Sequence, residues 1–321
     1  MRYSALFIVL IISCFITLPT HAQTPDLAVR YFQAGAKEMK NDNWLAAVED
    51  YTRAIEISAH LNPSKWQAKQ GTSGNGFGSL QSDSSEITII DPFTAKAYVG
   101  RSVAHFYLGD FDAAITDCDR ALKIKPGLAV AYLSRGSALS AKRDLNGAMR
   151  DFNRALTIDE HLVEAYNNRG ALRYDLGDIE GAMTDLNRAI SLNPKLAEPY
   201  YHRGYVLLDK KDFAGANSDF NRALELKPAF AWAYQGRGTL RMHEGRLNLA
   251  VSDFSRALEL EPDLAAAYGD RGLALIALGR ETEALRDIEK CLELKPELKS
   301  EFQGKIELAK KLMRANKAEM H

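Results

Sequence analysis

Residues Val163–Leu196 read VEAYNNRGALRYDLGDIEGAMTDLNRAISLNPKL, and the surrounding sequence repeats this pattern every 34 residues. Four residue types recur at fixed places in the pattern. The columns are Tyr98, Tyr132, Tyr166, Tyr200, Tyr234 and Tyr268; Arg101, Arg135, Arg169, Arg203, Arg237 and Arg271; Ala114, Ala148, Ala182, Ala216, Ala250 and Ala284; and Asp117, Asp151, Asp185, Asp219, Asp253 and Asp287. A fixed period of this length predicts stacked repeats of a small structural unit, in contrast to a domain closed around one core.

A turn marks the middle of each repeat, and in the repeat 163–196 it holds Gly177 followed by Asp178. Glycine ends a first helix in the left-handed conformation, and the aspartate carboxylate then caps the free amide groups of a second helix. Asp110, Asp144 and Asp212 occupy the same capping place. Arg246 and Arg280 replace it in the last two repeats, where we expect no side-chain cap.

These places resemble the tetratricopeptide repeat, whose pattern is an aromatic, a Gly, an Ala, an aromatic, an Ala and a Pro. In the repeat 129–162 they are Tyr132, Gly136, Ala148, Phe152 and Ala155, with Glu160 at the proline place. Seven repeats follow the pattern, at 28–61, 95–128, 129–162, 163–196, 197–230, 231–264 and 265–298. The resemblance implies an all-α fold, a right-handed α-solenoid of helix-turn-helix repeats with a capping helix and tail at 299–321.

An insert at 62–94 separates the first repeat, within 23–61, from the six contiguous repeats of 95–298. It is rich in Gly and Ser, so it buries too little apolar surface to offset the entropy of ordering and is predicted to be flexible. No Gly-Lys-Ser/Thr ending follows its glycines, which argues against a phosphate-binding loop. The alternative is that the insert docks in the groove of the repeats through Trp66, Phe77 and Ile87 to Ile90.

The amino terminus has the features of a secretory signal at 1–22. Arg2 precedes an apolar run, and Thr20 and Ala22 suit cleavage before Gln23. We therefore expect an exported protein, periplasmic or secreted. A bacterial lipoprotein anchored at Cys14 is the alternative.

Composition and motifs indicate a binding protein without cofactor or metal. The formal charge of −1 and pI of 6.7 give no basic field for nucleic acid. No catalytic motif is present, so we predict that the protein is not an enzyme. Cys118 and Cys291 are predicted to be free and buried. The Arg and Asp columns recur in every repeat, which indicates a structural role because a catalytic group is needed once.

In the family, places 2, 5, 6, 9, 12 and 13 of each repeat line a concave groove that holds a peptide or a partner's helix. Carried over to the central repeats, the resemblance implies a partner-binding groove of Glu164, Asn167, Asn168, Tyr174, Asp175, Glu198, Tyr201, His202, Tyr205, Asp209, Trp232, Gln235, Met242 and His243. The chaperone-binding carboxylate clamp is absent, because only its Asn168 is present and Leu133, Ser137, Glu198 and His202 stand at its other places. An asparagine ladder is absent too.

The sequence therefore predicts an interaction scaffold that binds a protein or peptide. Tyr174, Tyr201, Tyr205 and Trp232 are the expected contact residues, because Tyr and Trp predominate in interface hot spots. Neighbouring carboxylates would select a partner with basic residues beside its apolar anchors. Two alternatives stay open: a recognition module for cell-envelope glycan or peptidoglycan, and an accessory subunit of a secretion or outer-membrane assembly machine.

Overall fold

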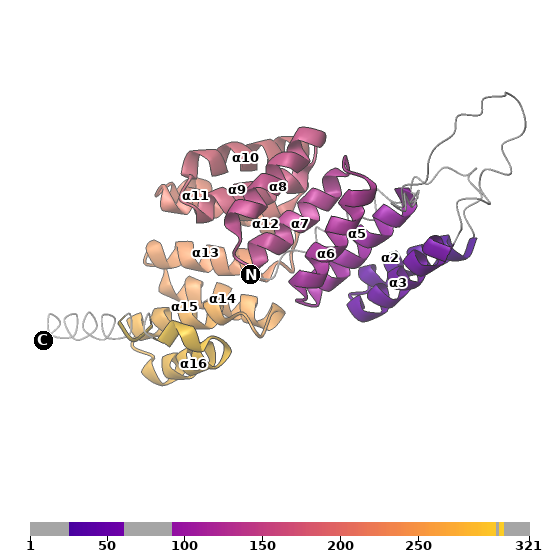
Figure 1. Ribbon diagram of the computed structural model, residues 1–321. Coiled ribbons are helices and arrows are strands. Elements are labelled where there is room, and N and C mark those ends of the chain that lie inside the picture. Colours follow the sequence, from indigo (N-terminus) through magenta and orange to yellow (C-terminus); the bar gives the residue numbers. More distant parts are fainter. Residues whose placement is uncertain (1–25, 61–91, 300–301, 305–321) are drawn as a thin grey trace, which may run out of the picture. The chain divides into compact units, whose positions relative to one another are not determined.

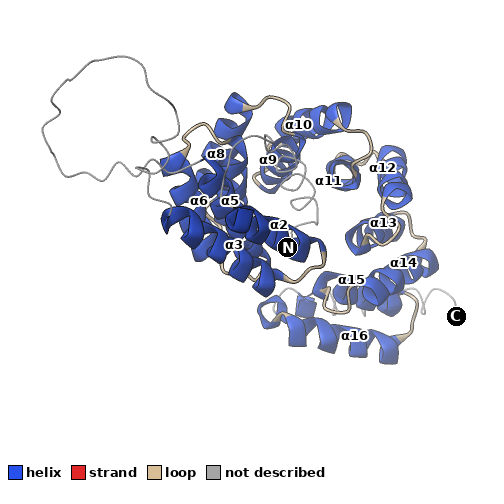
Figure 2. Cartoon of the chain, turned by 90° about the vertical axis from the view of Figure 1, so that its right-hand side faces the viewer, coloured by secondary structure: helices blue, strands red, loops and turns tan. Residues whose placement is uncertain are grey.

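The computed structural model describes residues 26–60, 92–299 and 302–304, and all regular structure in these ranges is helical (Figure 1, Figure 2). Fourteen α-helices and one short 3-10 helix occur there. This confirms the predicted all-α fold of tandem helix pairs. The predicted leader, most of the predicted insert and most of the predicted capping helix lie outside the described residues.

Each repeat contributes two helices joined by a short turn. Their bounds are α2 Asp26–Lys40, α3 Trp44–His60, α5 Pro92–Tyr107, α6 Phe111–Ile124, α7 Ala129–Ala141, α8 Leu145–Ile158, α9 Val163–Asp175, α10 Ile179–Leu192, α11 Ala197–Asp209, α12 Phe213–Leu226, α13 Ala231–His243, α14 Leu247–Leu260, α15 Ala265–Ala277 and α16 Glu281–Leu294, followed by the 3-10 helix Pro296–Leu298.

The chain divides into two compact halves, residues 1–172 and 173–321, with the boundary inside α9. In the first half the pairs are α2 with α3, α5 with α6, and α7 with α8, and neighbouring pairs meet through α3–α5 and α6–α7. In the second half the pairs are α11 with α12, α13 with α14, and α15 with α16, and they meet through α12–α13 and α14–α15. Within each half, these pairs therefore pack on one another in sequence order, as the period predicts.

The turns carry the predicted chemistry. Gly177 is in the left-handed region with a φ of 81°, and Asp178 accepts a hydrogen bond from the Gly181 amide at 2.9 Å. The same cap forms at Asp110, Asp144 and Asp212. Arg246 and Arg280 make no side-chain cap, as expected from their lack of an acceptor.

Aromatic rings of the second helices fit against glycines of the first helices. A Cβ on Gly204 would lie 2.7 Å from Cε1 of Phe220, and a Cβ on Gly236 in the next repeat would lie 2.5 Å from the same atom. Repeat 95–128 has Ser102 at the glycine place and Cys118 at the ring place. The Ser102 hydroxyl oxygen and the Cys118 sulfur are 3.0 Å apart. The small places therefore set how closely consecutive repeats approach.

The arginine column joins helices both within and between repeats. Arg203 donates two hydrogen bonds to Asp219 on α12, at 2.7 and 2.8 Å, and lies 5.7 Å from the ring centroid of Tyr200. Its third contact is with Asn187 of the preceding repeat, at 2.7 Å. Arg101, Arg135, Arg237 and Arg271 make the same three kinds of contact.

A second series of arginines, three residues after the aspartate column, includes Arg120 and Arg222, and both make local contacts. Arg120 pairs with Asp117, three residues earlier, at 3.5 Å and lies over Tyr98. Arg222 pairs instead with Glu225, three residues later, at 2.9 Å. Arg120 and Arg222 are thus engaged in ion pairs between residues three apart on one helix.

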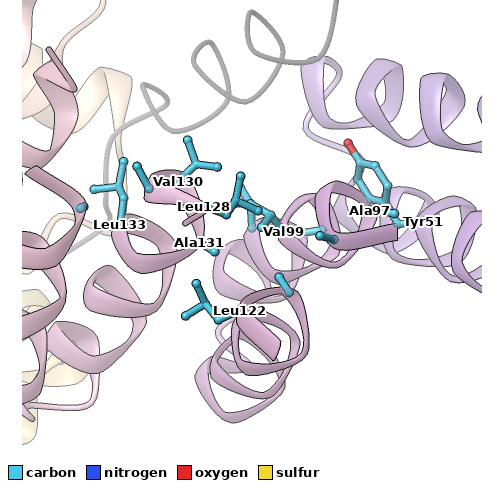
Figure 3. Packing of buried hydrophobic residues seen from close by; sticks show 14 of the residues in the cluster. Tyr51, Ala97, Val99, Leu122, Leu128, Val130, Ala131 and Leu133 are labelled. Atoms are coloured by element: carbon cyan, nitrogen blue, oxygen red, sulfur yellow. The ribbon is translucent and has the colours of Figure 1, made fainter. Parts of the chain in front are cut away.

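The first two repeats stack as consecutive repeats although an insert separates them in sequence. Arg101 donates to Thr52 at 3.0 Å, the contact equivalent to that between Arg203 and the preceding repeat. The ring of Tyr51 fits against Gly100 of the second repeat, and Figure 3 shows Tyr51 beside Ala97. The junction between repeats is therefore preserved across the insertion point.

Buried aliphatic residues continue this core through the first half. Figure 3 shows Val99, Leu122, Leu128, Val130, Ala131 and Leu133 following one another across successive repeats. Each repeat shares its apolar surface with its neighbours, because two short helices alone cannot bury it.

One described residue of the carboxyl-terminal region closes the last repeat. Phe302 is 5% exposed and packs with Ala265 and Cys291. A Cβ on Gly269 would lie 2.1 Å from its ring, so the phenyl group fills the place that a following repeat would take. This is the contact expected of the start of a cap; the rest of the predicted capping helix is outside the described residues.

Candidate partner-binding surface

The residues predicted to bind a partner lie on α9, α11 and α13, the first helices of three consecutive repeats. Glu164, Asn167 and Asn168 belong to the first half of the chain, and the other predicted residues belong to the second half. The two groups are described separately below.

In the first half, the predicted polar residues face protein more than solvent. Glu164 and Asn167 are buried. Asn167 donates to Asn168 at 3.1 Å, and Asn168 donates in turn to Ser137 of α7 at 3.1 Å. The side-chain oxygen of Asn167 has no partner among the described residues. Asn167 and Asn168 therefore form a short polar chain between α7 and α9.

In the second half, polar side chains link the first helices of successive repeats. Tyr174 donates to Asp209 at 2.7 Å. Tyr205 donates to the side-chain oxygen of Gln235, whose amide nitrogen donates to Asp270 at 2.6 Å. A hydrogen-bonded chain thus runs from α11 through α13 to α15.

Asp270 was not predicted as a site residue, although the sequence carried a signal for it. It occupies place six of its repeat, the place of Asn168 and His202 in other repeats. It accepts a second, longer contact of 3.4 Å from Thr239, which belongs to the same face of α13 as Gln235.

The predicted aromatic residues also support helix packing. Tyr201 lies 5.2 Å from the ring of Phe230 and 5.3 Å from that of Tyr205. Trp232 packs against buried residues of two neighbouring clusters, and its indole nitrogen has no hydrogen-bond acceptor among the described residues. Tyr174 packs against Ala182, Leu186 and Val206. Each of these rings is partly buried and partly available on the surface.

Glu198 differs from the other predicted carboxylates because it is only 2% exposed. Lys227 donates to it at 3.1 Å and also lies 4.7 Å from the ring centroid of Phe230. This ion pair between the half-buried Lys227 and the buried Glu198 holds the end of α12 against α11, and separating it would leave the Glu198 charge buried without its partner. Glu198 is therefore placed to serve packing, while Asp175 and Asp209 are exposed.

Met242 and His243 lie at the end of α13, close to the turn. Met242 packs against the cluster of Ala250 and Phe254. The ring of His243 stacks on Phe213 of the preceding repeat, with centroids 6.2 Å apart. Trp44 stacks on Tyr107 in the corresponding way in the first half, 4.3 Å apart, so this place makes contacts between repeats.

Burial and nearby carboxylates shift the titration of this surface. Burial raises the pKa of Tyr174, and its hydrogen bond to Asp209 raises it further; burial and then the charge of Asp175 raise the pKa of Tyr201. Burial lowers the pKa of His202 to about 4, so this imidazole is neutral at physiological pH. The surface therefore presents neutral rings next to the side chains of Asp175 and Asp209.

The described residues offer no arrangement for metal binding, since they contain no group of three or more His, Cys, Asp or Glu side chains placed to hold an ion. Cys118 and Cys291 are both buried, as predicted, and burial raises the pKa of the Cys118 thiol to about 12. One open depression involves side chains already engaged by the arginine contacts; it is lined by Tyr200, Arg203, Asn217, Ser218, Asp219, Asn221, Arg222 and Glu225.

Sequence profiles of the tetratricopeptide repeat match residues 95–128, 129–162, 197–230 and 265–298, and a related TPR repeat profile matches 170–211. Together these matches cover just over half of the chain. The chain belongs to the tetratricopeptide repeat family. The matched boundaries at 95, 129, 197 and 265 coincide with those read from the 34-residue period.

Solved structures of tetratricopeptide repeat proteins share this fold. A tetratricopeptide repeat protein from Parabacteroides merdae is 16% identical, with 88% of this chain and 98% of that chain covered and a TM-score of 0.59. A chain of the APC/C hetero-tetramer Cut9-Hcn1 is 13% identical, with 92% and 58% covered and a TM-score of 0.62. PilF of Pseudomonas aeruginosa is 20% identical, with 69% and 97% covered and a TM-score of 0.52. At these identities the likeness concerns the fold.

No curated protein sequence matches the chain. Among the helices of the described ranges, none is long and apolar enough to cross a membrane.

Proposed function

We propose that this tetratricopeptide repeat protein is a non-catalytic scaffold that holds a protein or peptide partner against the first helices of residues 173–321, from the end of α9 through α11 to α13. Arrays of stacked repeats offer an extended surface suited to binding. The observation that supports this location is the group of partly buried tyrosines, Tyr174, Tyr201 and Tyr205, beside the exposed carboxylates of Asp175 and Asp209. Tyrosine supplies a large contact area with little loss of side-chain entropy.

The charge of this surface favours a basic partner. Asp175 and Asp209 end α9 and α11, where they flank the tyrosines. Complementary charge steers encounter and selects among partners more than it adds affinity. The partner we propose therefore carries basic residues beside its apolar anchors.

We also propose that the protein acts outside the cytoplasm, in the periplasm or as a secreted protein, on the strength of the leader sequence at 1–22. Expression in a bacterial host followed by mass measurement of the mature chain tests this. A chain that begins near Gln23 supports export with cleavage. A lipid-modified Cys14 would identify an anchored lipoprotein, and an uncleaved chain in the cytoplasm would contradict export.

Partner capture tests the scaffold function directly. Full-length protein immobilised on beads should retain a specific protein from an envelope extract. Co-sedimentation with purified cell-wall sacculi provides the competing measurement, because exposed tyrosine rings also suit sugar stacking. Sedimentation with sacculi and no retained protein would favour the glycan-recognition alternative, whereas a retained component of a secretion or assembly machine would favour an accessory subunit.

Two neighbouring tyrosines offer a matched pair of variants. Tyr201 lies on the proposed surface, while Tyr200 lies under the arginine column beside Arg203. Tyr201→Leu should weaken capture by about tenfold, or about 1.4 kcal/mol, with most apolar packing retained. Tyr200→Leu should reduce stability without changing capture by the folded fraction. Equal loss of capture in both variants would place the binding surface elsewhere.

A further inference from the structure

Three hydrogen-bond donors on the first helices of residues 173–321 are already committed to neighbouring helices. The hydroxyl of Tyr174 donates to Asp209, the hydroxyl of Tyr205 donates to Gln235, and the side-chain amide of Gln235 donates to Asp270. An ionised carboxylate accepts through about four lone-pair sites, and Tyr174 occupies one of those on Asp209. Apart from the buried indole N–H of Trp232, which has no acceptor among the described residues, this surface consequently has more acceptor capacity than donor capacity to offer a ligand.

The aromatic groups of the same surface are clustered. Tyr201 meets Tyr205 edge to face, with centroids 5.3 Å apart and an interplanar angle of 81°, and lies 4.8 Å from the ring of His202. Tyr174 and Asp209 stand at the ends of α9 and α11. Ring faces attract cations, so the tyrosines and the carboxylates favour the same class of ligand.

We propose that this surface selects a guanidinium group, namely an arginine side chain of the partner, which stacks on the tyrosines and donates to Asp209. This inference rests on the proposed function. A guanidinium is planar, donates through a fork of N–H groups that matches a carboxylate, and stacks on aromatic rings. The ammonium of lysine is a compact, strongly hydrated charge and makes only part of these contacts.

An acidic ligand meets the opposite conditions. It would approach Asp175 and Asp209 with like charge, and the donors of Tyr174, Tyr205 and Gln235 would first have to leave their present acceptors. A peptide with a carboxylate-rich sequence should therefore be excluded. Neutral peptides should bind through ring contacts alone.

Labelled peptides of otherwise identical sequence provide the probes. Four peptides of leucine and serine differ only at two positions, which hold arginine, citrulline, lysine or glutamate. Both ends of each peptide are blocked. Binding to the full-length protein is followed by fluorescence anisotropy at low ionic strength. The arginine peptide should bind about tenfold more tightly than the citrulline peptide, which has nearly the same shape without the charge, with lysine between them and no binding of glutamate.

Asp209→Asn tests the residue, because Asp209 is exposed and its loss should leave the fold intact. It should lower the affinity for the arginine peptide about tenfold and leave that for the citrulline peptide unchanged. Glu225→Gln is the matched control: it removes the same charge from α12, where Glu225 pairs with Arg222 at 2.9 Å, and should change affinity by less than about twofold.

Several results would overturn the arginine site. They are equal affinity for the arginine and citrulline peptides, tighter binding of the glutamate peptide, no binding of the arginine peptide, or equal effects of Asp209→Asn and Glu225→Gln. Failure of the scaffold function gives a different result, since wild-type protein would then retain no partner from an extract. A partner retained equally by wild type and Asp209→Asn would leave the scaffold standing and remove the arginine site.

Discussion

Gly236→Ala should destabilise the second half of the protein, although alanine favours helices. The Phe220 ring is held between two glycines of consecutive repeats, Gly204 and Gly236. The added methyl group would stand 2.5 Å from Cε1 and 2.9 Å from Cζ of that ring. Carbon atoms attract one another best at about 3.5–4.0 Å, so either the ring or α13 has to move.

The expected magnitude is the difference between two opposing effects. Overpacking a well-filled core costs about 1–3 kcal/mol. Replacing glycine by alanine within a helix returns roughly 0.5–1 kcal/mol. The ring cannot avoid the methyl group by moving toward Gly204, because it already lies against the backbone there: a Cβ built on Gly204 would be only 2.7 Å from the same ring atom. We therefore expect a net loss of about 1–2 kcal/mol.

Urea denaturation of the full-length protein, followed by circular dichroism, measures this loss. Repeat arrays can unfold in segments, so hydrogen exchange of amides in α11 to α13 should be used to locate it. Gly127→Ala is the control, because nothing lies within 4 Å of its added methyl group. Its effect should stay within about 0.5 kcal/mol, as for most surface substitutions.

A second substitution separates the ring contact from other effects. Phe220→Leu introduces the residue that the preceding repeat has at the same place, Leu186. In its presence Gly236→Ala should cost less than in the wild type, giving a coupling between the two sites. Two results would refute the idea that the Phe220 ring leaves no space for a side chain at residue 236. One is a Gly236→Ala variant as stable as the wild type, and the other is additive effects of the two substitutions in the double variant.

Three further predictions concern a titrating group, a helix cap and the end of the array. Burial lowers the pKa of His202 to about 4, below the ordinary value of about 6.5, so between these two pH values the unfolded chain binds more protons than the folded one. The free energy of unfolding should therefore fall by up to about 1.4 kcal/mol per pH unit as the pH drops from about 6.5 toward 4. His202→Asn should flatten this dependence in denaturation curves measured across that range. Asp178→Ala should lower the free energy of unfolding by about 1 kcal/mol, whereas Arg246→Ala at the same place, where no cap forms, should change it little; equal losses would contradict the capping role. Truncation after Pro296 removes Phe302 from its packing against Gly269 and should cause aggregation or non-cooperative melting in calorimetry and light scattering; an unchanged, monomeric melting profile would contradict a capping role.

The sequence was sufficient to predict the helices, turns and caps because their constraints recur. Asp178 and its counterparts each meet the same demand at the start of a second helix, so the residue reappears every 34 positions. The partner of each column arginine in the preceding repeat was not predicted. Several side chains satisfy that contact, among them Thr52, Asn187 and Ser255, so no single residue type recurs to reveal it.

The contacts among the residues of the predicted surface could be predicted less completely than the fold, because each contact occurs once. The pairing of Gln235 with Asp270 and the burial of Glu198 against Lys227 depend on which residues face each other at one junction. The 34-residue period of the sequence gives no information about a contact that is made at only one junction between repeats. The family resemblance selected the helix face but could not separate Glu198, which is buried, from Asp209, which is exposed.

The fit between rings and glycines places a condition on the order in which repeats follow one another. Phe220 fills the space in front of Gly236, and Tyr51 fills that in front of Gly100. Removing residues 197–230 would keep the 34-residue phase but bring the repeat of Leu186 directly before Gly236, with an aliphatic side chain where a ring is needed. Gain or loss of whole repeats in such a chain is therefore compatible with folding only where the two new neighbours have matching volumes, and the array behaves as an ordered series of modules that are not freely interchangeable.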